Sequence, residues 1–257
     1  MRRLLIGLLL LATAAAHAGR PCEERPLAVG DVERGMHLAE AARQRLDASG
    51  AQVVMIGRVG QDLSQYGLHY SHLGFAYRDS EASAWRVVHK LNDCGRAEAS
   101  LYRQGLGEFF LDRMQRYEAG IVVLAPDAQQ KLLPLLRDNQ RVTQWHTPAY
   151  SMLAYPWATR YQQSNQWALE TLAGALEPAA TTRRQAQAWL QLHDYRPTTL
   201  RLGPLTRLGA RMTRANIAFD DHPNDKRFSD RIETVSVDSV FAWLQRSGLG
   251  AATLAVY

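Results

Sequence analysis

The stretch that decides the fold is Ser71-His72-Leu73-Gly74-Phe75-Ala76-Tyr77-Arg78, followed after a short polar connection by Trp85-Arg86-Val87-Val88-His89-Lys90-Leu91. Both runs are rich in aromatic and β-branched residues, and residues 79–84 between them favour a turn. The pattern predicts a β-hairpin. If His72 pairs directly with His89, the two side chains share one face of the hairpin, and a slip of one residue separates them.

Outward from the hairpin, strands and helices alternate in a way that groups the strands near the middle of the chain. We expect further strands over 51–57, 99–104, 119–124 and 232–237, and helices over 31–48, 108–116, 162–176, 182–193, 205–214 and 239–246. Another helix begins at Pro126, with a kink or break at Pro134. We expect Asp31 to cap the helix over 31–48, and either Thr181 or Thr182 to cap the helix over 182–193. Residues 219–231 are expected to form a polar loop. This order predicts an α+β fold, a central antiparallel sheet flanked by helices. Residues 19–178 form its core, and 179–257 form a mixed, partly helical extension packed on it.

The N-terminus has the three parts of a secretory signal peptide, expected over residues 1–18. Arg2 and Arg3 are followed by an apolar stretch from Leu4 to Ala15 and by Ala16-His17-Ala18, a small-x-small cleavage site. The apolar stretch is too short to span a bilayer core of about 30 Å. We therefore expect a periplasmic or secreted protein with no transmembrane segment in the mature chain.

The charge and the cysteine content limit which partners and which chemistry are expected. The net charge is +5, and no run of basic residues is interleaved with aromatics, so nucleic acid is not an expected partner. The chain has two cysteines, Cys22 and Cys94, which in an oxidising compartment are expected to form a disulfide; a reactive thiol at Cys94 is the alternative. Nothing in the sequence points to a cofactor or a metal.

Two segments have the residues needed for acyl chemistry. His72 opens a strand and is followed by Gly74, an arrangement that can present a general base, although a structural hydrogen-bonding histidine is the alternative. Ser164 lies where the helix over 162–176 begins, where amides and the helix dipole favour an anion; Ser164 or Asn165 as a simple N-cap is the alternative.

The order of these segments resembles that of the circularly permuted papain-like proteins, relatives of the NlpC-type cell-wall peptidases and of lecithin retinol acyltransferase. A narrower resemblance, over most of the mature length, is to an uncharacterised bacterial family, domain-of-unknown-function family 2145. The residues that carry the narrower resemblance are Tyr70-Ser71-His72-Leu73-Gly74-Phe75-Ala76, Val88-His89-Lys90-Leu91-Asn92, Gln163-Ser164-Asn165-Gln166-Trp167 and Asn216-Ile217-Ala218-Phe219-Asp220-Asp221-His222-Pro223.

The broader resemblance implies a hydrolase or acyltransferase that acts on an amide or ester, with a cell-envelope peptide, lipid or protein as its partner. His72 then matches the family base, and Ser164 stands where those proteins have a nucleophilic cysteine. A third residue that orients His72 is either His89 or Asn92. Because serine is far less acidic than cysteine, a non-catalytic binding or scaffold protein on the same fold is the second hypothesis.

Four further residues are candidates for binding a substrate: Asp62, Tyr155, Tyr161 and Gln166. For Asp62 a solvated loop carboxylate is the alternative, and most aromatic residues between Trp145 and Tyr161 are expected to pack. The run from Asp220 to Asp225 places carboxylates beside an imidazole, but its spacing matches no known calcium or zinc pattern. We interpret it as a structural loop.

Overall fold

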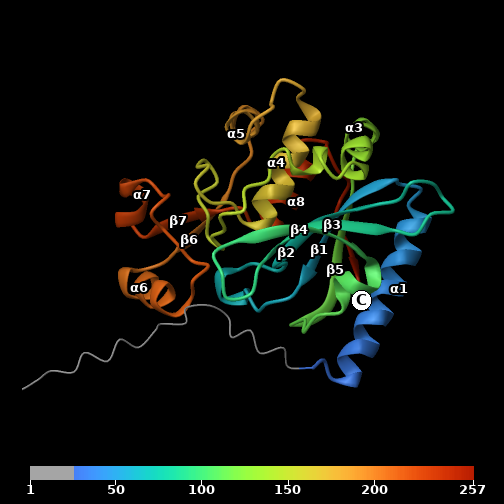
Figure 1. Cartoon of the computed structure of the whole chain (residues 1–257), viewed down its shortest axis with the longest axis horizontal. Helices are drawn as coiled ribbons and strands as arrows, with labels where there is room; N and C mark the ends of the chain where they lie inside the picture. Colours follow the sequence, from blue (N-terminus) through green and yellow to red (C-terminus); the bar gives the residue numbers. More distant parts are fainter. Residues whose placement is uncertain (1–25) are drawn as a thin grey trace, which may run out of the picture.

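The protein, described here from a computed structural model over residues 26–257, is built around a six-stranded antiparallel sheet (Figure 1). The strand order is β4-β3-β2-β1-β5-β8. The strands are β1 (Val53–Val59), β2 (His72–Tyr77), β3 (Arg86–Asn92), β4 (Ala99–Gly105), β5 (Arg116–Val123) and β8 (Leu254–Val256). The predicted hairpin is therefore present as β2 and β3, at the middle of the sheet.

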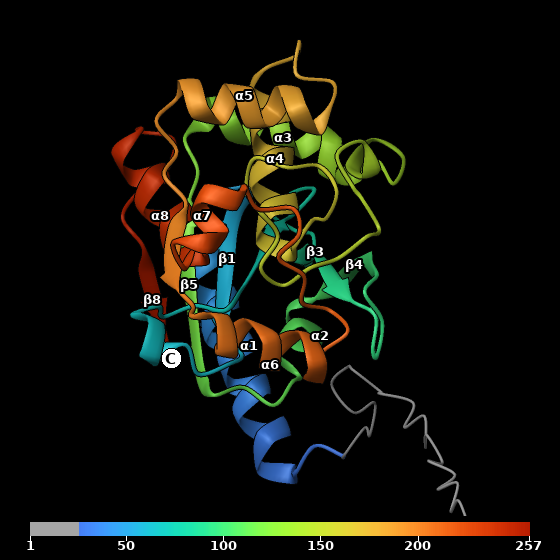
Figure 2. The ribbon, with the colours of Figure 1, turned by 90° about the vertical axis from the view of Figure 1, so that its left-hand side faces the viewer.

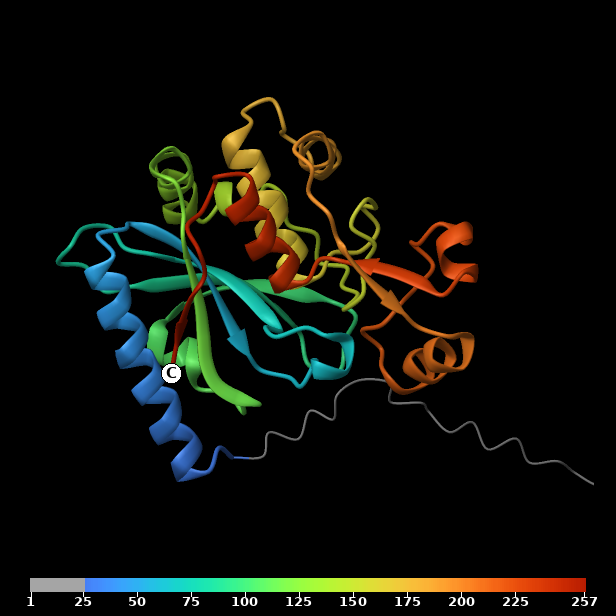
Figure 3. The same cartoon turned by 180° about the vertical axis from the view of Figure 1, so that it is seen from behind.

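Helices cover both faces of this sheet, so the main body has three layers (Figure 3). Successive strand residues point to opposite faces. In β1, Val53 and Met55 face a core that includes α3 (Pro126–Arg137), α4 (Ser164–Leu176) and α8 (Val237–Arg246). Val54 and Ile56 face a second core, with α1 (Val29–Ala48) and α2 (Leu106–Phe110). Both faces are apolar because both are covered.

A smaller lobe is formed by the residues that follow α5 (Arg183–Leu192) and precede α8 in the sequence. It contains β6 (Thr198–Arg201), which pairs with β7 (Arg231–Thr234), together with α6 (Pro204–Thr213) and α7 (Asn224–Phe228). Figures 1 and 3 show this lobe beside the sheet, at the end opposite α1. The chain then returns to the main body through α8 and β8, which pairs with β5. Residues 179–257 therefore complete the main sheet as well as forming the lobe.

Several local expectations agree with the structure. Thr182 caps α5 (Arg183–Leu192) in a capping box with Gln185, because each residue's side chain bonds the other's backbone. The predicted helix over 205–214 is α6, and the one over 239–246 is α8, which begins two residues earlier.

Other local expectations were wrong, each for an identifiable reason. Asp31 does not cap α1: the helix starts after Ala28, and Asp31 in its first turn accepts hydrogen bonds from Arg34 and Tyr117. The helix α3 is not broken at Pro134, and packing of its buried leucines stabilises it; a kink at Pro134 stays a prediction. The helix expected over 108–116 is α2, which ends at Phe110, and β5 starts at Arg116.

The α+β class and the central antiparallel sheet flanked by helices are thus confirmed. The permuted papain-like architecture stays a prediction. Within residues 26–257, no helix combines the length and the apolar character needed to cross a membrane. The predicted signal peptide and Cys22 lie outside the described residues, so the leader and the disulfide also stay predictions.

Candidate functional site

A cavity of about 670 Å³ opens beside the sheet, where β2 and β3 part. In the described chain, the ladder between these strands ends at the pair Gly74–His89, while β2 stays paired to β1 as far as His72 and β3 stays paired to β4 as far as Asn92. The two strands therefore diverge. The cavity is also lined by the loop after β1, the first turn of α4, and parts of α6 and β7.

His72 and His89 meet at the point where the strands diverge. Gly74, not His72, is the residue directly opposite His89, so the register differs by two residues from direct pairing of the histidines. A shift by two residues keeps side chains on the same face, and the rings reach each other diagonally, with His72 Nε2 2.8 Å from His89 Nδ1. An added Cβ at Gly74 lies only 3.0 Å from His89 Cβ, so the glycine makes room for this contact.

A chain of hydrogen bonds fixes which nitrogen of His72 carries the proton. Gln104 Nε2 donates to a Glu108 carboxylate oxygen (3.0 Å), which turns Gln104 Oε1 toward His89 Nε2 (2.7 Å). Since Oε1 only accepts, His89 is protonated on Nε2 and accepts at Nδ1. His72 then donates from Nε2, and its Nδ1 holds the free lone pair. The network thus presents a neutral His72 whose basic nitrogen is Nδ1.

The surroundings of the two rings keep them uncharged. Burial lowers the pKa of His72 well below its usual value, and the nearby Arg58 guanidinium and His89 lower it further. Burial and Arg58 lower the pKa of His89 to about 4. Arg58 is the β1 partner of His72 and donates to Asp112 Oδ2 at 2.9 Å and to the Phe109 carbonyl oxygen. At neutral pH, His72 is therefore available as a proton acceptor.

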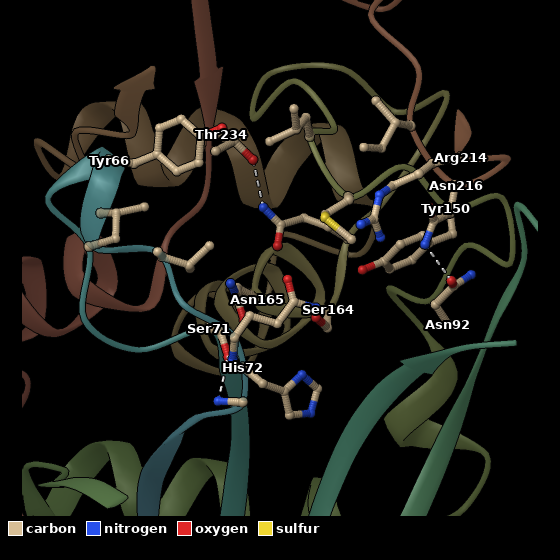
Figure 4. Close-up of a pocket in the computed structure, with 18 of the residues that line it drawn as sticks. Tyr66, Ser71, His72, Asn92, Tyr150, Ser164, Asn165, Arg214, Asn216 and Thr234 are labelled. Carbon is tan, nitrogen blue, oxygen red and sulfur yellow. Dashed lines mark hydrogen bonds between the residues drawn. The ribbon is translucent and has the colours of Figure 1, made fainter. Parts of the chain in front are cut away.

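Ser164 is the first residue of α4 and lines the same cavity (Figure 4). The N-cap is Gln163, not Ser164 or Asn165, and no side chain caps the helix. Gln163 Nε2 donates to Thr234 Oγ1 and to the Val235 carbonyl oxygen, both at 2.7 Å, and so ties the start of α4 to β7. Within the described residues, no side-chain hydrogen bond caps the amides of the first turn, which can therefore receive an anion.

Figure 4 shows His72 and Ser164 on the walls of one pocket, with the His72 ring beneath the start of α4. Strand alternation places His72 on the sheet face that carries α2, whereas α4 packs on the opposite face. The two residues line the same cavity because it lies at the end of the sheet. Within residues 26–257, no hydrogen bond joins Ser164 Oγ to His72.

Two buried amide oxygens in the cavity wall have no hydrogen-bond partner in the described chain: Asn165 Oδ1 and Asn216 Oδ1. The amide nitrogens of both side chains are engaged, Asn165 with the Val235 carbonyl oxygen at 3.2 Å and Asn216 with Asn92 Oδ1 at 2.7 Å. A buried acceptor without a partner is costly. Both oxygens are almost completely shielded from solvent, although their residues line the cavity.

Asn92, the alternative partner for His72, has another role. Its side chain donates to the carbonyl oxygens of Arg96 (2.8 Å) and Glu98 (2.6 Å) and accepts from Asn216. It thus closes the turn between β3 and β4, and it lines the cavity. The residue that contacts His72 is His89.

Of the predicted substrate-binding residues, Asp62 alone lines the cavity. It is exposed at the rim, where it accepts from the backbone and hydroxyl of Ser64, and these hydrogen bonds lower its pKa. Tyr155 and Tyr161 lie outside the lining: the Tyr155 ring packs 5.0 Å from that of His222, and Arg160 stacks over Tyr161.

Gln166 belongs to a buried network on the side of α4 that faces away from the cavity. It donates to the carbonyl oxygens of Tyr155 and Pro156 and to Glu170 Oε1. Glu170 also pairs with Arg183 at 2.7 Å, and both are buried. Gln166 is therefore a structural residue in this structure, which the sequence alone did not distinguish from a ligand-binding one.

The segment from Asp220 to Asp225 runs into the short helix α7, which interrupts the polar loop expected over 219–231, and it is held by contacts within the protein. Asp221 accepts from His222 Nδ1 (3.0 Å) and from the backbone of Tyr155 (2.7 Å), and Asp220 pairs with Arg160 at 2.9 Å. Across the described ranges, no three His, Cys, Asp or Glu residues are grouped so that they could hold a metal ion.

Sequence reasoning missed Gln104 and Glu108, which set the orientation of His89, and Arg214 and Asn216 as cavity-lining side chains. Gln104 ends one strand and Glu108 follows it by four residues, but only the register of β4 against β3 brings Gln104 to His89. Asn216 lies 124 residues from its partner Asn92. No local pattern encodes such contacts.

Comparison with known proteins gives one match. A sequence profile of a bacterial family, described as uncharacterized protein conserved in bacteria (DUF2145), matches residues 45–244, which include β1 to β5 of the main sheet, α4 and the residues that line the cavity. No curated protein and no solved structure matches the chain. Since the matched region covers most of the chain, the protein belongs to this family of uncharacterized bacterial proteins.

Proposed function

We propose that the protein is a hydrolase or acyltransferase that acts on an amide or ester, with Ser164 as nucleophile and His72 as general base. The observation that carries the proposal is the oriented, neutral His72, held by His89 and Gln104 in the same cavity as an uncapped Ser164. The fold implied by this proposal is the permuted papain-like one.

In the first step, Ser164 Oγ forms a bond to the substrate carbonyl carbon while its proton passes to His72 Nδ1. The amides of the first turn of α4 stabilise the oxyanion. His72 then gives that proton to the leaving amine or alcohol as the C–N or C–O bond breaks. Water, or the hydroxyl or amine of an acceptor, attacks the acyl-enzyme and frees Ser164. His89 acts as a positioning residue.

Asn165, adjacent in sequence to Ser164, lines the same cavity. The resemblance to the papain-like cell-wall peptidases supports a substrate with amide groups. Peptides of the cell envelope have such groups at regular spacing, and we propose them as the first substrates to test.

The test compares wild type with Ser164→Ala on a panel of acyl esters and peptidoglycan peptides. We expect kcat/KM to fall by at least about 1000-fold for the substrates that are turned over. Ser80→Ala, at an exposed position in the connection between β2 and β3, is the matched control and should retain full activity. Equal turnover by wild type and Ser164→Ala would overturn the proposal.

A second candidate function is a binding protein that uses the cavity without chemistry. One specific observation favours it: Ser164 Oγ and His72 share the cavity without a hydrogen bond between them in the described residues. Calorimetric titration with peptidoglycan fragments distinguishes the two functions. Binding of equal affinity by wild type and Ser164→Ala, without turnover, would support the second function.

We also propose that the chain is exported and that Cys22 and Cys94 form a disulfide in the mature protein. Cys94 lies at the turn after β3 and lines the cavity. The mass of protein recovered from the periplasm or medium tests both points: we expect loss of residues 1–18 and of two hydrogens relative to the reduced chain. A full-length, reduced mass would contradict them.

A further inference from the structure

The helix α6 exposes an apolar stripe. Leu205, Leu208 and Met212 are 84%, 56% and 66% exposed. Their spacing of three and four residues puts them on one side of the helix. The opposite side faces the protein: Ala210 packs on the apolar core of the small lobe, and Arg207 bonds to the Leu202 carbonyl oxygen and to Asp230. Among residues 26–257, no element covers the outward stripe.

Positive charge surrounds this stripe. Arg201, at the end of β6, and Arg211 and Arg214, on or next to α6, are exposed. In the part of the chain that the structure describes, no ion pair joins any of these three side chains to a carboxylate. An amphipathic helix with leucine and methionine on one side and arginine beside them is typical of proteins that lie on an anionic membrane surface.

The position of α6 ties this surface to the cavity. Thr206, Ala210 and Arg214 line the cavity, so one side of the helix forms part of its wall. Figure 1 shows α6 at the outer end of the small lobe, and Figure 2 shows it at the near side of the molecule. A membrane against the stripe would therefore lie across α6 from the cavity.

We propose that α6 docks the protein on an anionic lipid bilayer. The side chains of Leu205, Leu208 and Met212 enter the boundary between head groups and acyl chains, while Arg201 and Arg211 contact lipid phosphates. The size of the stripe favours a bilayer over a protein. A helix of ten residues is about 15 Å long, and three side chains cover far less than the roughly 800 Å² per partner of a stable protein interface. This inference does not depend on the proposed chemistry.

The test is co-sedimentation of the protein, as the cell processes it, with vesicles of phosphatidylglycerol and phosphatidylcholine. We expect binding to these vesicles and at least about tenfold weaker binding to vesicles of phosphatidylcholine alone. Leu208→Glu and Arg211→Glu should each weaken binding to the anionic vesicles by about tenfold. Both positions are exposed, so native fluorescence and melting temperature should stay unchanged.

Two matched variants serve as controls. Leu192→Glu and Arg184→Glu change an exposed leucine and an exposed arginine on α5, and both should bind like wild type. Wild-type protein that fails to sediment with anionic vesicles would overturn the proposal. So would binding that Leu208→Glu leaves intact, or equal binding to both kinds of vesicle. A concentration-dependent dimer that Leu208→Glu abolishes, in the absence of vesicle binding, would assign the stripe to self-association instead.

Discussion

Replacing His89 by glutamine should remove a defined part of the pH dependence of folding. His89 is fully buried, and burial lowers its pKa to about 4, from 6.5. As pH falls below about 6.5, the unfolded chain takes up a proton at this site while the native state stays neutral. The stability from this site is therefore fully present above pH 6.5 and is lost as pH falls toward 4.

The size of the effect follows from the two pKa values. One pKa unit corresponds to about 1.4 kcal/mol, so between about pH 7.5 and pH 4.5 the site should cost the native state about 2 kcal/mol. In His89→Gln the replacing amide can accept from His72 and donate to Gln104, so both hydrogen-bond partners remain satisfied.

The assay is urea unfolding followed by tryptophan fluorescence at about pH 7.5 and pH 4.5. Over this range, the free energy of unfolding of wild type should fall by about 2 kcal/mol more than that of His89→Gln. Between about pH 7 and pH 8, the free energies of unfolding of the two proteins should change in parallel. The comparison cancels the contribution of other buried groups. Equal losses in the two proteins would mean that His89 is not held neutral in the native state, and the proton assignment at His72 would fail with it.

Three further predictions concern the site and the buried network behind α4. Gly74→Ala should lower the free energy of unfolding by about 1–3 kcal/mol in urea, because the added Cβ meets the backbone and a side chain of β3 at 3.0 Å. Gly105→Ala is the control, since an added Cβ there has nothing within 4 Å. Equal effects of the two substitutions would refute the tight packing at Gly74. Glu170→Gln should cost about 3–5 kcal/mol, since it leaves the buried Arg183 without its counter-charge, and a melting temperature like that of wild type would contradict this. In Ser164→Cys, alkylation by iodoacetamide should have a midpoint below pH 8.5, because the first turn of α4 favours a thiolate; a midpoint above this value would contradict the anion-binding role.

Much of the fold follows from local pattern. The strands of the β2–β3 hairpin differ from the predicted ones by a residue at their ends, because aromatic and β-branched residues stop where the polar connection begins. The amphipathic helix α5 and its cap at Thr182 were also predictable, because a capping box is a local device. The strands β6 and β8 were not: they have four and three residues, too few for a periodic signal.

The site was predictable only in part, because some of its contacts depend on strand pairing that no local pattern encodes. His72, His89 and Ser164 stand out by residue type and position, and the structure puts all three in or beside one cavity. The register between β2 and β3 depends on the whole sheet, so the choice of Gly74 as the partner of His89 could not be read from the turn. The fixed proton positions depend on Gln104, which only tertiary pairing brings to His89.

The most direct test of the proposed chemistry is labelling of the intact protein with a fluorophosphonate, followed by mapping of the modified peptide by mass spectrometry. Such a probe reacts with a serine only where a base activates the hydroxyl and an oxyanion site receives the phosphonyl oxygen. We predict that the label falls on Ser164 and is lost in His72→Ala, while Ser80→Ala is labelled like wild type. A wild-type protein with Ser164 unlabelled, or labelling that survives in His72→Ala, would contradict the Ser164–His72 mechanism.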